Sequence, residues 1–140
     1  MKTLIIIDVQ NDFLPGGQLE VPQSNLIVPV INRIQNCFDL VVATQDWHPK
    51  NHKSFASKHL GKRPFDSMVL NGLQQTLWPD HCIQGSEGAS FHRDLETDKI
   101  AAMRQSLGDG EFYAYGGGET PEMELMSLEY YFLLKKGLIY

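Results

Sequence analysis

Two short apolar runs with a helical pattern between them open the chain. The first run, Thr3 to Asp8, is rich in β-branched side chains and is typical of a strand buried on both faces. The second run extends from Leu40 to Ala43 and is followed at once by polar residues. Between the runs, the spacing predicts an amphipathic helix with Ser24 as its N-cap. The apolar positions of this helix are Leu26, Ile27, Val30, Ile31 and Ile34, with Pro29 as an early interruption.

The order strand, helix, strand predicts a right-handed βαβ unit within a parallel α/β sheet. Ligands of such open sheets bind beyond the carboxyl ends of the strands. Asp8 and Asp46 follow the two apolar runs at these ends. We therefore expect both carboxylates at the ligand-binding edge of the sheet.

The pattern weakens further along the chain. Residues 47 to 92 are rich in histidine, glycine, proline and serine, which favours a long functional loop region with short helices at most. The segment from Asp98 to Met103 predicts a third strand. Thr120 as a cap and Pro121 at the first helical position predict a helix over about residues 121–136.

Composition points to one domain over residues 1–140, since 42% of the residues are hydrophobic. The net charge of -5 disfavours nucleic acid, whose binding needs clustered basic residues. The run from Leu4 to Ile7 is too short for a signal-peptide core or a bilayer span. Two cysteines are too few for a disulfide framework and suit a reducing compartment. We expect a cytoplasmic protein with neither a nucleic-acid nor a membrane partner.

His81 and Cys82 are adjacent, which raises the question of a catalytic dyad. Neighbouring side chains point to opposite faces of a strand, or about 100 degrees apart on a helix, so they are poorly placed to share a proton. The preferred interpretation is that Cys82 is a small buried hydrophobic residue, and the same interpretation holds more strongly for Cys37.

Asp46 and His48 form an Asp-x-His pair whose side chains project from one side of an extended chain. Together with His81 they have the composition of a catalytic metal site that leaves positions open. The alternative, an exposed loop Asp and His, is the commoner explanation of such a pair. Of the other histidines, His52 is close enough in sequence to reach the same ion. His52, His59 and His92 are interpreted as solvated or surface residues.

Three segments, in this order, resemble one enzyme family. They are LIIIDVQNDFLPGG, VVATQDWHPKNHKSFAS and LWPDHCIQGSEGASFH. They resemble the nicotinamidases, also called pyrazinamidases, of the isochorismatase-like cysteine hydrolase group. The resemblance covers residues 1 to about 103, and residues 104–140 diverge. It implies a three-layer α/β fold with a parallel sheet that is cut short after about three strands.

The resemblance implies metal-dependent deamidation of nicotinamide to nicotinate and ammonia, a step of NAD salvage. Asp8 matches the family's catalytic acid–base residue, and Phe13 and Trp78 match aromatic residues that line the pyridine pocket. The resemblance also implies one bound divalent metal ion. Zinc is the preferred identity, and iron and manganese are the alternatives. The residues that match its ligands are Asp46, His48 and His81.

Two catalytic groups of the family have no counterpart here. The sequence lacks a Lys-Gly stretch soon after DKIAA, where the family has one, and an Ala-x-Asp-x-Cys-Val stretch that would carry the nucleophile. Lys99 and Arg104 lie near the expected lysine without matching it. A non-catalytic metal- and pyridine-binding protein, or an interaction module on the same fold, therefore stays open as an alternative. A short sheet would also leave a strand edge that homo-oligomerisation or a partner would cover.

Overall fold

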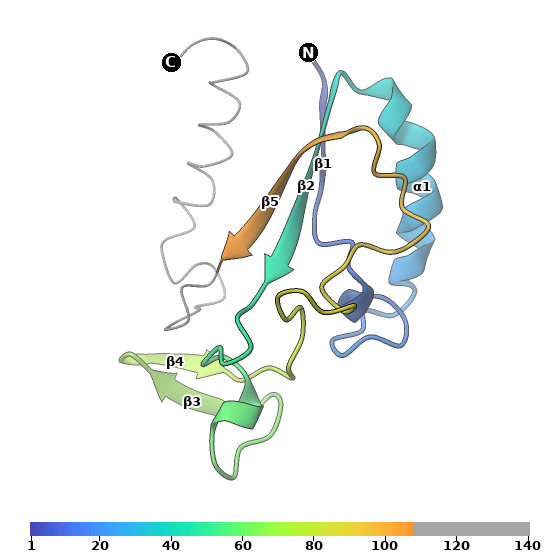
Figure 1. The fold of residues 1–140 in the computed structure, drawn as a ribbon. Helices are drawn as coiled ribbons and strands as arrows, with labels where there is room; N and C mark the ends of the chain where they lie inside the picture. The colour runs from blue at the N-terminus through green and yellow to red at the C-terminus, as the bar shows by residue number, and fades with distance from the viewer. Residues whose placement is uncertain (108–140) are drawn as a thin grey trace, which may run out of the picture.

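A parallel sheet organises residues 1–107, which are the residues that the computed structural model describes. Its strands are β1 (Thr3–Ile6), β2 (Leu40–Trp47) and β5 (Ile100–Leu107), in the order β1-β2-β5. Both outer strands run parallel to β2, and their carboxyl ends point to the same side of the molecule (Figure 1). The parallel α/β class is confirmed. The helix expected at about residues 121–136 lies outside the described residues.

The helix α1 (Ile27–Ile34) connects β1 to β2 and packs beside the sheet (Figure 1). Its buried side chains Val28 and Ile31 join apolar residues of the two strands and of the following loops in one core. Removing such an aliphatic side chain from water stabilises the fold by about 1.5–3 kcal/mol. The buried members of this core are Ile6, Val9, Val28, Ile31, Val41, Ala43 and Leu95.

The start of the helix differs from the prediction. Residues Ser24–Leu26 form a 3-10 turn, and the α-helix begins only at Ile27. Ser24 does not cap it, because its hydroxyl donates to the carbonyl of Phe13 at 2.8 Å. Pro29 fits without a break because it lies in the first turn, where a backbone N–H has no partner within the helix.

The predicted apolar face of the helix is wrong in part. Leu26, Ile27 and Val30 are exposed, and Val28 takes a buried position that the prediction did not include. Cys37 was expected to be buried on this helix, and it is exposed. A 3-10 turn, Gln35–Cys37, follows the helix and buries Gln35 in place of the cysteine.

The strands do not begin and end at the same residues as the apolar runs that predicted them. β1 ends at Ile6, before Asp8, whereas β2 continues past Ala43 to Trp47. β5 pairs with β2 as far as Trp47 and so holds the polar part of β2 in extended form. The third strand is confirmed, although it begins at Ile100 and extends to Leu107.

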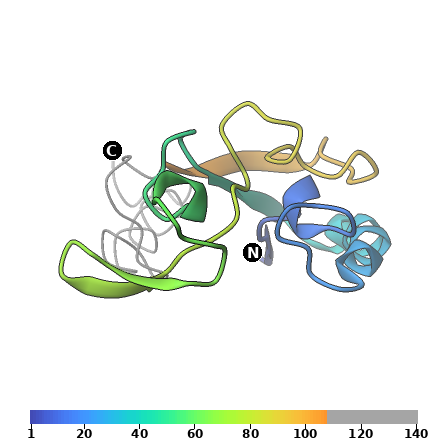
Figure 2. The ribbon, with the colours of Figure 1, turned by 90° about the horizontal axis from the view of Figure 1, so that it is seen from below.

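A hairpin lies in the region that was expected to form loops. It consists of β3 (Ser67–Leu70) and β4 (Leu73–Thr76), which pair antiparallel. The hairpin lies beyond the end of β2, on the opposite side of the molecule from α1 in both views (Figures 1 and 2). Asn71 and Gly72 connect the strands with positive φ at both positions, as a type I′ turn requires. This Asn-Gly pair was the sequence signal for the hairpin.

None of the helices in the described part of the chain is long and apolar enough to span a bilayer.

Two distant loops are joined around the carboxylate of Asp12. The backbone of residues 9 to 12 bonds to residues 88 to 92, as in Asp12 N–H to the Gly88 carbonyl at 3.0 Å. The buried Asp12 side chain accepts the N–H of Cys82 at 2.7 Å and that of Gln18 at 3.3 Å. A Cβ on Gly88 would lie 2.1 Å from the carboxylate oxygen of Asp12. Glycine at this position is therefore a steric requirement.

We predict that Gly88→Ala destabilises the protein by about 1–3 kcal/mol, the usual cost of overpacking a close contact. Gly85→Ala is the matched control, because its Cβ would meet nothing within 4 Å. The positive φ of Gly85, 74°, disfavours alanine by roughly 1–2 kcal/mol, so this variant measures a backbone cost without a steric contact. Urea unfolding measures both, and a Gly88 variant as stable as the parent would contradict the contact.

Candidate metal centre

Three side chains converge at the carboxyl end of β2. The Asp46 carboxylate lies 2.9 Å from His48 Nε2 through one oxygen and 3.2 Å from His81 Nε2 through the other. One ligand atom from each of the three residues lies within 4.8 Å of the other two. Two imidazole nitrogens and one carboxylate oxygen at such spacing form a donor set that suits zinc, iron or manganese.

Backbone pairing brings the two histidines together from distant parts of the sequence. The N–H of His48 donates to the carbonyl of Cys82, and the N–H of Gln84 donates to the carbonyl of His48, both at 2.9 Å. The segment that follows His81 therefore runs parallel to the chain just after β2, where His48 and Ile83 form a parallel β-bridge. This pairing fixes His81 against Asp46.

The ring of His81 is oriented by its own loop. Its Nδ1 lies 2.7 Å from the carbonyl of Pro79, which can only accept, so Nδ1 donates the proton. In the neutral ring the Nε2 lone pair then faces Asp46, whereas the protonated ring donates from Nε2 to the Asp46 carboxylate. A backbone acceptor of this kind commonly fixes the tautomer of a metal-binding histidine.

The charges of the cluster stabilise one another. Burial favours the neutral form of Asp46, yet hydrogen bonds and charge attraction from His48 and His81 outweigh it and lower the pKa of Asp46 to about 2. Burial likewise disfavours the charged form of His81. The hydrogen bonds to Asp46 and Pro79 outweigh that cost and raise the pKa of His81.

Aromatic rings enclose the two histidines. Phe55 is fully buried and packs edge-on against both histidines. Its ring centre lies 5.3 Å from that of His48 and 5.6 Å from that of His81. His52 stacks near His48 with 4.7 Å between ring centres, and its Nδ1 lies 2.6 Å from Ser54 Oγ. The interpretation of His52 as a solvated residue is wrong, because it is fully buried. Its sequence neighbours gave no sign of burial, which results from contact with His48 and Phe55.

The remaining two histidines lie outside the cluster. His59 is half-buried, and its Nε2 lies 2.7 Å from the carbonyl of Lys53. His92 is also half-buried and lies beside Asp94.

Asp8 follows β1 in a left-handed backbone conformation with φ of 51°. Such a conformation is uncommon for a residue other than glycine and is often held at functional sites. The half-buried carboxylate of Asp8 accepts a hydrogen bond from the hydroxyl of Thr44 at 2.7 Å. Thr44 belongs to β2, so the two predicted carboxylates, Asp8 and Asp46, are both held by that strand.

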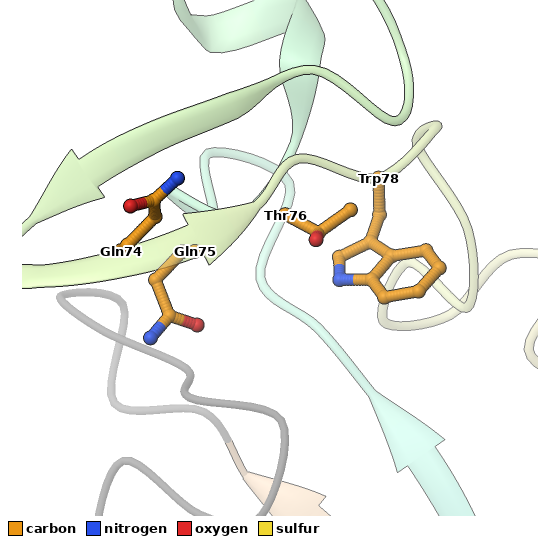
Figure 3. Close-up of a pocket in the computed structure, with 4 residues that line it drawn as sticks. All are labelled: Gln74, Gln75, Thr76 and Trp78. Carbon is orange, nitrogen blue, oxygen red and sulfur yellow. The ribbon is translucent and has the colours of Figure 1, made fainter.

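The two predicted pocket aromatics have different surroundings. Phe13 packs edge-on against His81, with 5.8 Å between ring centres. Trp78 packs edge-on against Phe65 at 6.0 Å and lines a hollow of about 370 Å³ beside β4. Figure 3 shows its indole together with the other lining side chains, Gln74, Gln75 and Thr76.

Several known proteins are similar to this chain in sequence and fold. The chain is 55% identical to the nicotinamidase of Acinetobacter baylyi over 93 residues, which are 66% of this chain and 44% of that protein. A nicotinamidase/pyrazinamidase structure from Acinetobacter baumannii matches with a TM-score of 0.71 and 48% identity, covering 76% of this chain and 52% of the other. A pyrazinamidase of Pyrococcus horikoshii in complex with zinc matches with a TM-score of 0.60 and 32% identity, covering 91% and 64%. No protein-family model matches the sequence.

Over residues 1 to about 103, this chain belongs to the nicotinamidase family. It spans about half the length of the curated relatives that it matches.

Cys82 does not have the properties of this family's nucleophile. Its side chain is fully buried, and burial together with the negative charges of Asp46, Asp12 and Asp8 raises the pKa of its thiol far above the ordinary value. A neutral buried thiol is a poor nucleophile. The prediction that Cys82 acts as a small buried residue agrees with its place in the structure.

Three polar residues around the candidate site had no predicted role. Gln10 and Asp12 lie within the quoted LIIIDVQNDFLPGG segment, and both are buried. Thr44 lies in β2 and binds Asp8. Polar residues directly after an apolar strand were the available signal, although most of their partners lie 36 to 79 positions away in sequence.

We predict that one thiol per native chain reacts quickly with a disulfide reagent at pH 8. Cys37 is exposed and Cys82 is buried, and the sequence has no other cysteine. Absorbance of the released thiolate counts the reactive groups. Cys37→Ser removes the fast phase, and guanidinium restores reactivity at Cys82; two fast thiols in the native chain would contradict this assignment.

A pH dependence of stability follows for the metal-free chain. The raised pKa of His81 means that its stabilising contact with Asp46 is complete below about pH 6.5 and is lost as the pH rises through that raised value. The lowered pKa of Asp46 means that its contribution holds above about pH 4 and is lost as the pH falls toward 2. We expect the difference in Tm between the parent and His81→Gln, measured in a chelator, to shrink from pH 6 to pH 9. A difference that stays constant over this range would contradict the pairing.

Proposed function

We propose that this chain is a nicotinamidase-type amidohydrolase, which takes part in the conversion of nicotinamide to nicotinate and ammonia in NAD salvage. The observation that carries the proposal is the convergence of Asp46, His48 and His81 at the strand ends. The sequence identity of 55% to a nicotinamidase supports the choice of substrate.

The three converging residues would hold one divalent metal ion, with zinc as the first choice and iron or manganese next. Support comes from the donor chemistry and from a pyrazinamidase that was solved in complex with zinc. When bound, such an ion supplies Lewis-acid chemistry, by orienting the pyridine nitrogen or polarising a water molecule. Asp46 is suited to this role because its low pKa keeps it ionised at neutral pH.

Asp8 would serve as the acid–base group that accepts and returns protons at the carboxamide. The hydrogen bond from Thr44 holds its carboxylate in place at the end of β1. Phe13 and Trp78 would contact the pyridine ring. Phe13 already lies against the ring of His81, which supports a position next to the ion.

One observation favours a second candidate, which is metal and pyridine binding without hydrolysis. The family's reaction proceeds through a cysteine thiolate, and this chain has only Cys37 and Cys82. Cys37 lies at the end of the turn after α1, and Cys82 is buried with a raised pKa. The two candidates share the metal centre and differ in ammonia release.

Ammonia release from nicotinamide by the full 140-residue chain, with zinc, iron or manganese supplied, separates them. The amidohydrolase proposal predicts release that is lost in Asp8→Ala. Nicotinamide binding without ammonia would overturn hydrolysis and support the second candidate. Asp46→Ala should abolish stoichiometric metal binding, measured by metal analysis after gel filtration. Zinc retained at one equivalent in that variant would contradict the metal site, and an interaction module would then be the better explanation.

A further inference from the structure

Gln10 is a fully buried polar side chain to which the proposed chemistry assigns no role. Its amide nitrogen donates to the carbonyl of Asp46 at 2.8 Å, and its amide oxygen accepts the N–H of Asp46 at 2.7 Å. The same nitrogen also donates to the carbonyl of Ala89 at 2.8 Å. One side chain thus binds both backbone groups of a residue in the metal cluster.

This double contact replaces a missing strand. β1 pairs with β2 only as far as Ile6 and Ala43, because the chain turns away at Asp8. In a parallel pair, the N–H and C=O of one residue point to the same neighbouring strand. At Asp46 that neighbour is absent, and the side-chain amide of Gln10 offers one donor and one acceptor in its place.

The segment that carries Gln10 is itself held in place by a second loop. Residues 9 to 12 pair with residues 88 to 92 through backbone hydrogen bonds, including Asn11 N–H to the Ser90 carbonyl at 3.0 Å. Asp12, two residues from Gln10, accepts the N–H of Cys82 at 2.7 Å. The same short segment therefore holds Asp46 through Gln10 and the residue next to His81 through Asp12.

We propose that Gln10 is a positioning residue for the metal centre, which sets the place of the Asp46 carboxylate by fixing the backbone of Asp46. This inference rests on the proposed metal-binding function. It assigns no contact between Gln10 and the ion. Its effect passes through Asp46, whose carboxylate must meet the imidazoles of His48 and His81 at once.

The test compares Gln10→Met with the parent in the full chain. Methionine keeps the length of the side chain and removes both hydrogen bonds to Asp46. Gln45→Met is the matched control, because Gln45 is also buried and donates to the same Ala89 carbonyl at 3.0 Å. The control reproduces the loss of a buried glutamine and of a bond to Ala89 without removing the bonds to the Asp46 backbone.

Zinc affinity, measured by competition with a chromophoric chelator, should fall about 10- to 100-fold in Gln10→Met, as for other residues that orient metal ligands. It should stay within about twofold in Gln45→Met. The visible absorption bands of bound Co²⁺ should shift in the Gln10 variant alone, since they report the geometry of the ligands. Thermal unfolding of both variants shows whether each is folded.

Hydrogen exchange of the Asp46 amide in the metal-free chain is read separately, and it should quicken in Gln10→Met relative to Gln45→Met. Unchanged exchange at Asp46 would overturn the contact itself. Unchanged zinc affinity and Co²⁺ spectrum in a parent that binds metal would overturn the positioning role. A parent that binds no metal would overturn the proposed function instead, and the two failures are thereby distinguished.

Discussion

The candidate site depends on one constraint, which is that β1 stops pairing with β2 before β2 ends. From Thr44 to Trp47, β2 keeps β5 as its neighbour on one side and loses β1 on the other. Leaving a buried backbone group unpaired costs roughly 1–3 kcal/mol. The chain satisfies these groups with a side-chain amide at Asp46 and continues with a loop backbone at His48. Both substitutes are drawn from segments that carry other residues of the site.

This constraint explains how a small sheet assembles residues from three parts of the sequence. Asp8 leaves β1 in a left-handed conformation and is held by Thr44 of β2. The loop that contains His81 is joined to the end of β2 by hydrogen bonds to His48. The Asp8 carboxylate and the loop that contains His81 therefore both have hydrogen bonds to β2 or to the residue that follows it. Rigid support of this kind is what a metal centre needs if its ligands are to meet one ion.

Electrostatics complements the geometry. A carboxylate that is largely buried would ordinarily become neutral, and Asp46 stays ionised because two imidazoles face it from different loops. The same negative charges act in the opposite sense on Cys82, whose thiol they help to keep protonated. One cluster therefore favours a cation beside Asp46 and disfavours a thiolate beside it. The three side chains of the cluster are therefore suited to a divalent cation, and the nearby thiol is kept protonated.

The sequence by itself determined the parallel α/β class and the family of residues 1 to about 103, because apolar runs and contiguous motifs are local properties of a chain. It also singled out Asp46, His48 and His81, since an Asp-x-His pair on an extended chain is visible in the letters. Only the tertiary structure decided the burial of His52, the exposure of Cys37 and the bonds of Gln10 to Asp46. Those features arise from partners far apart in sequence, and no local pattern of hydrophobic and polar residues specifies which distant backbone group a buried side chain will meet.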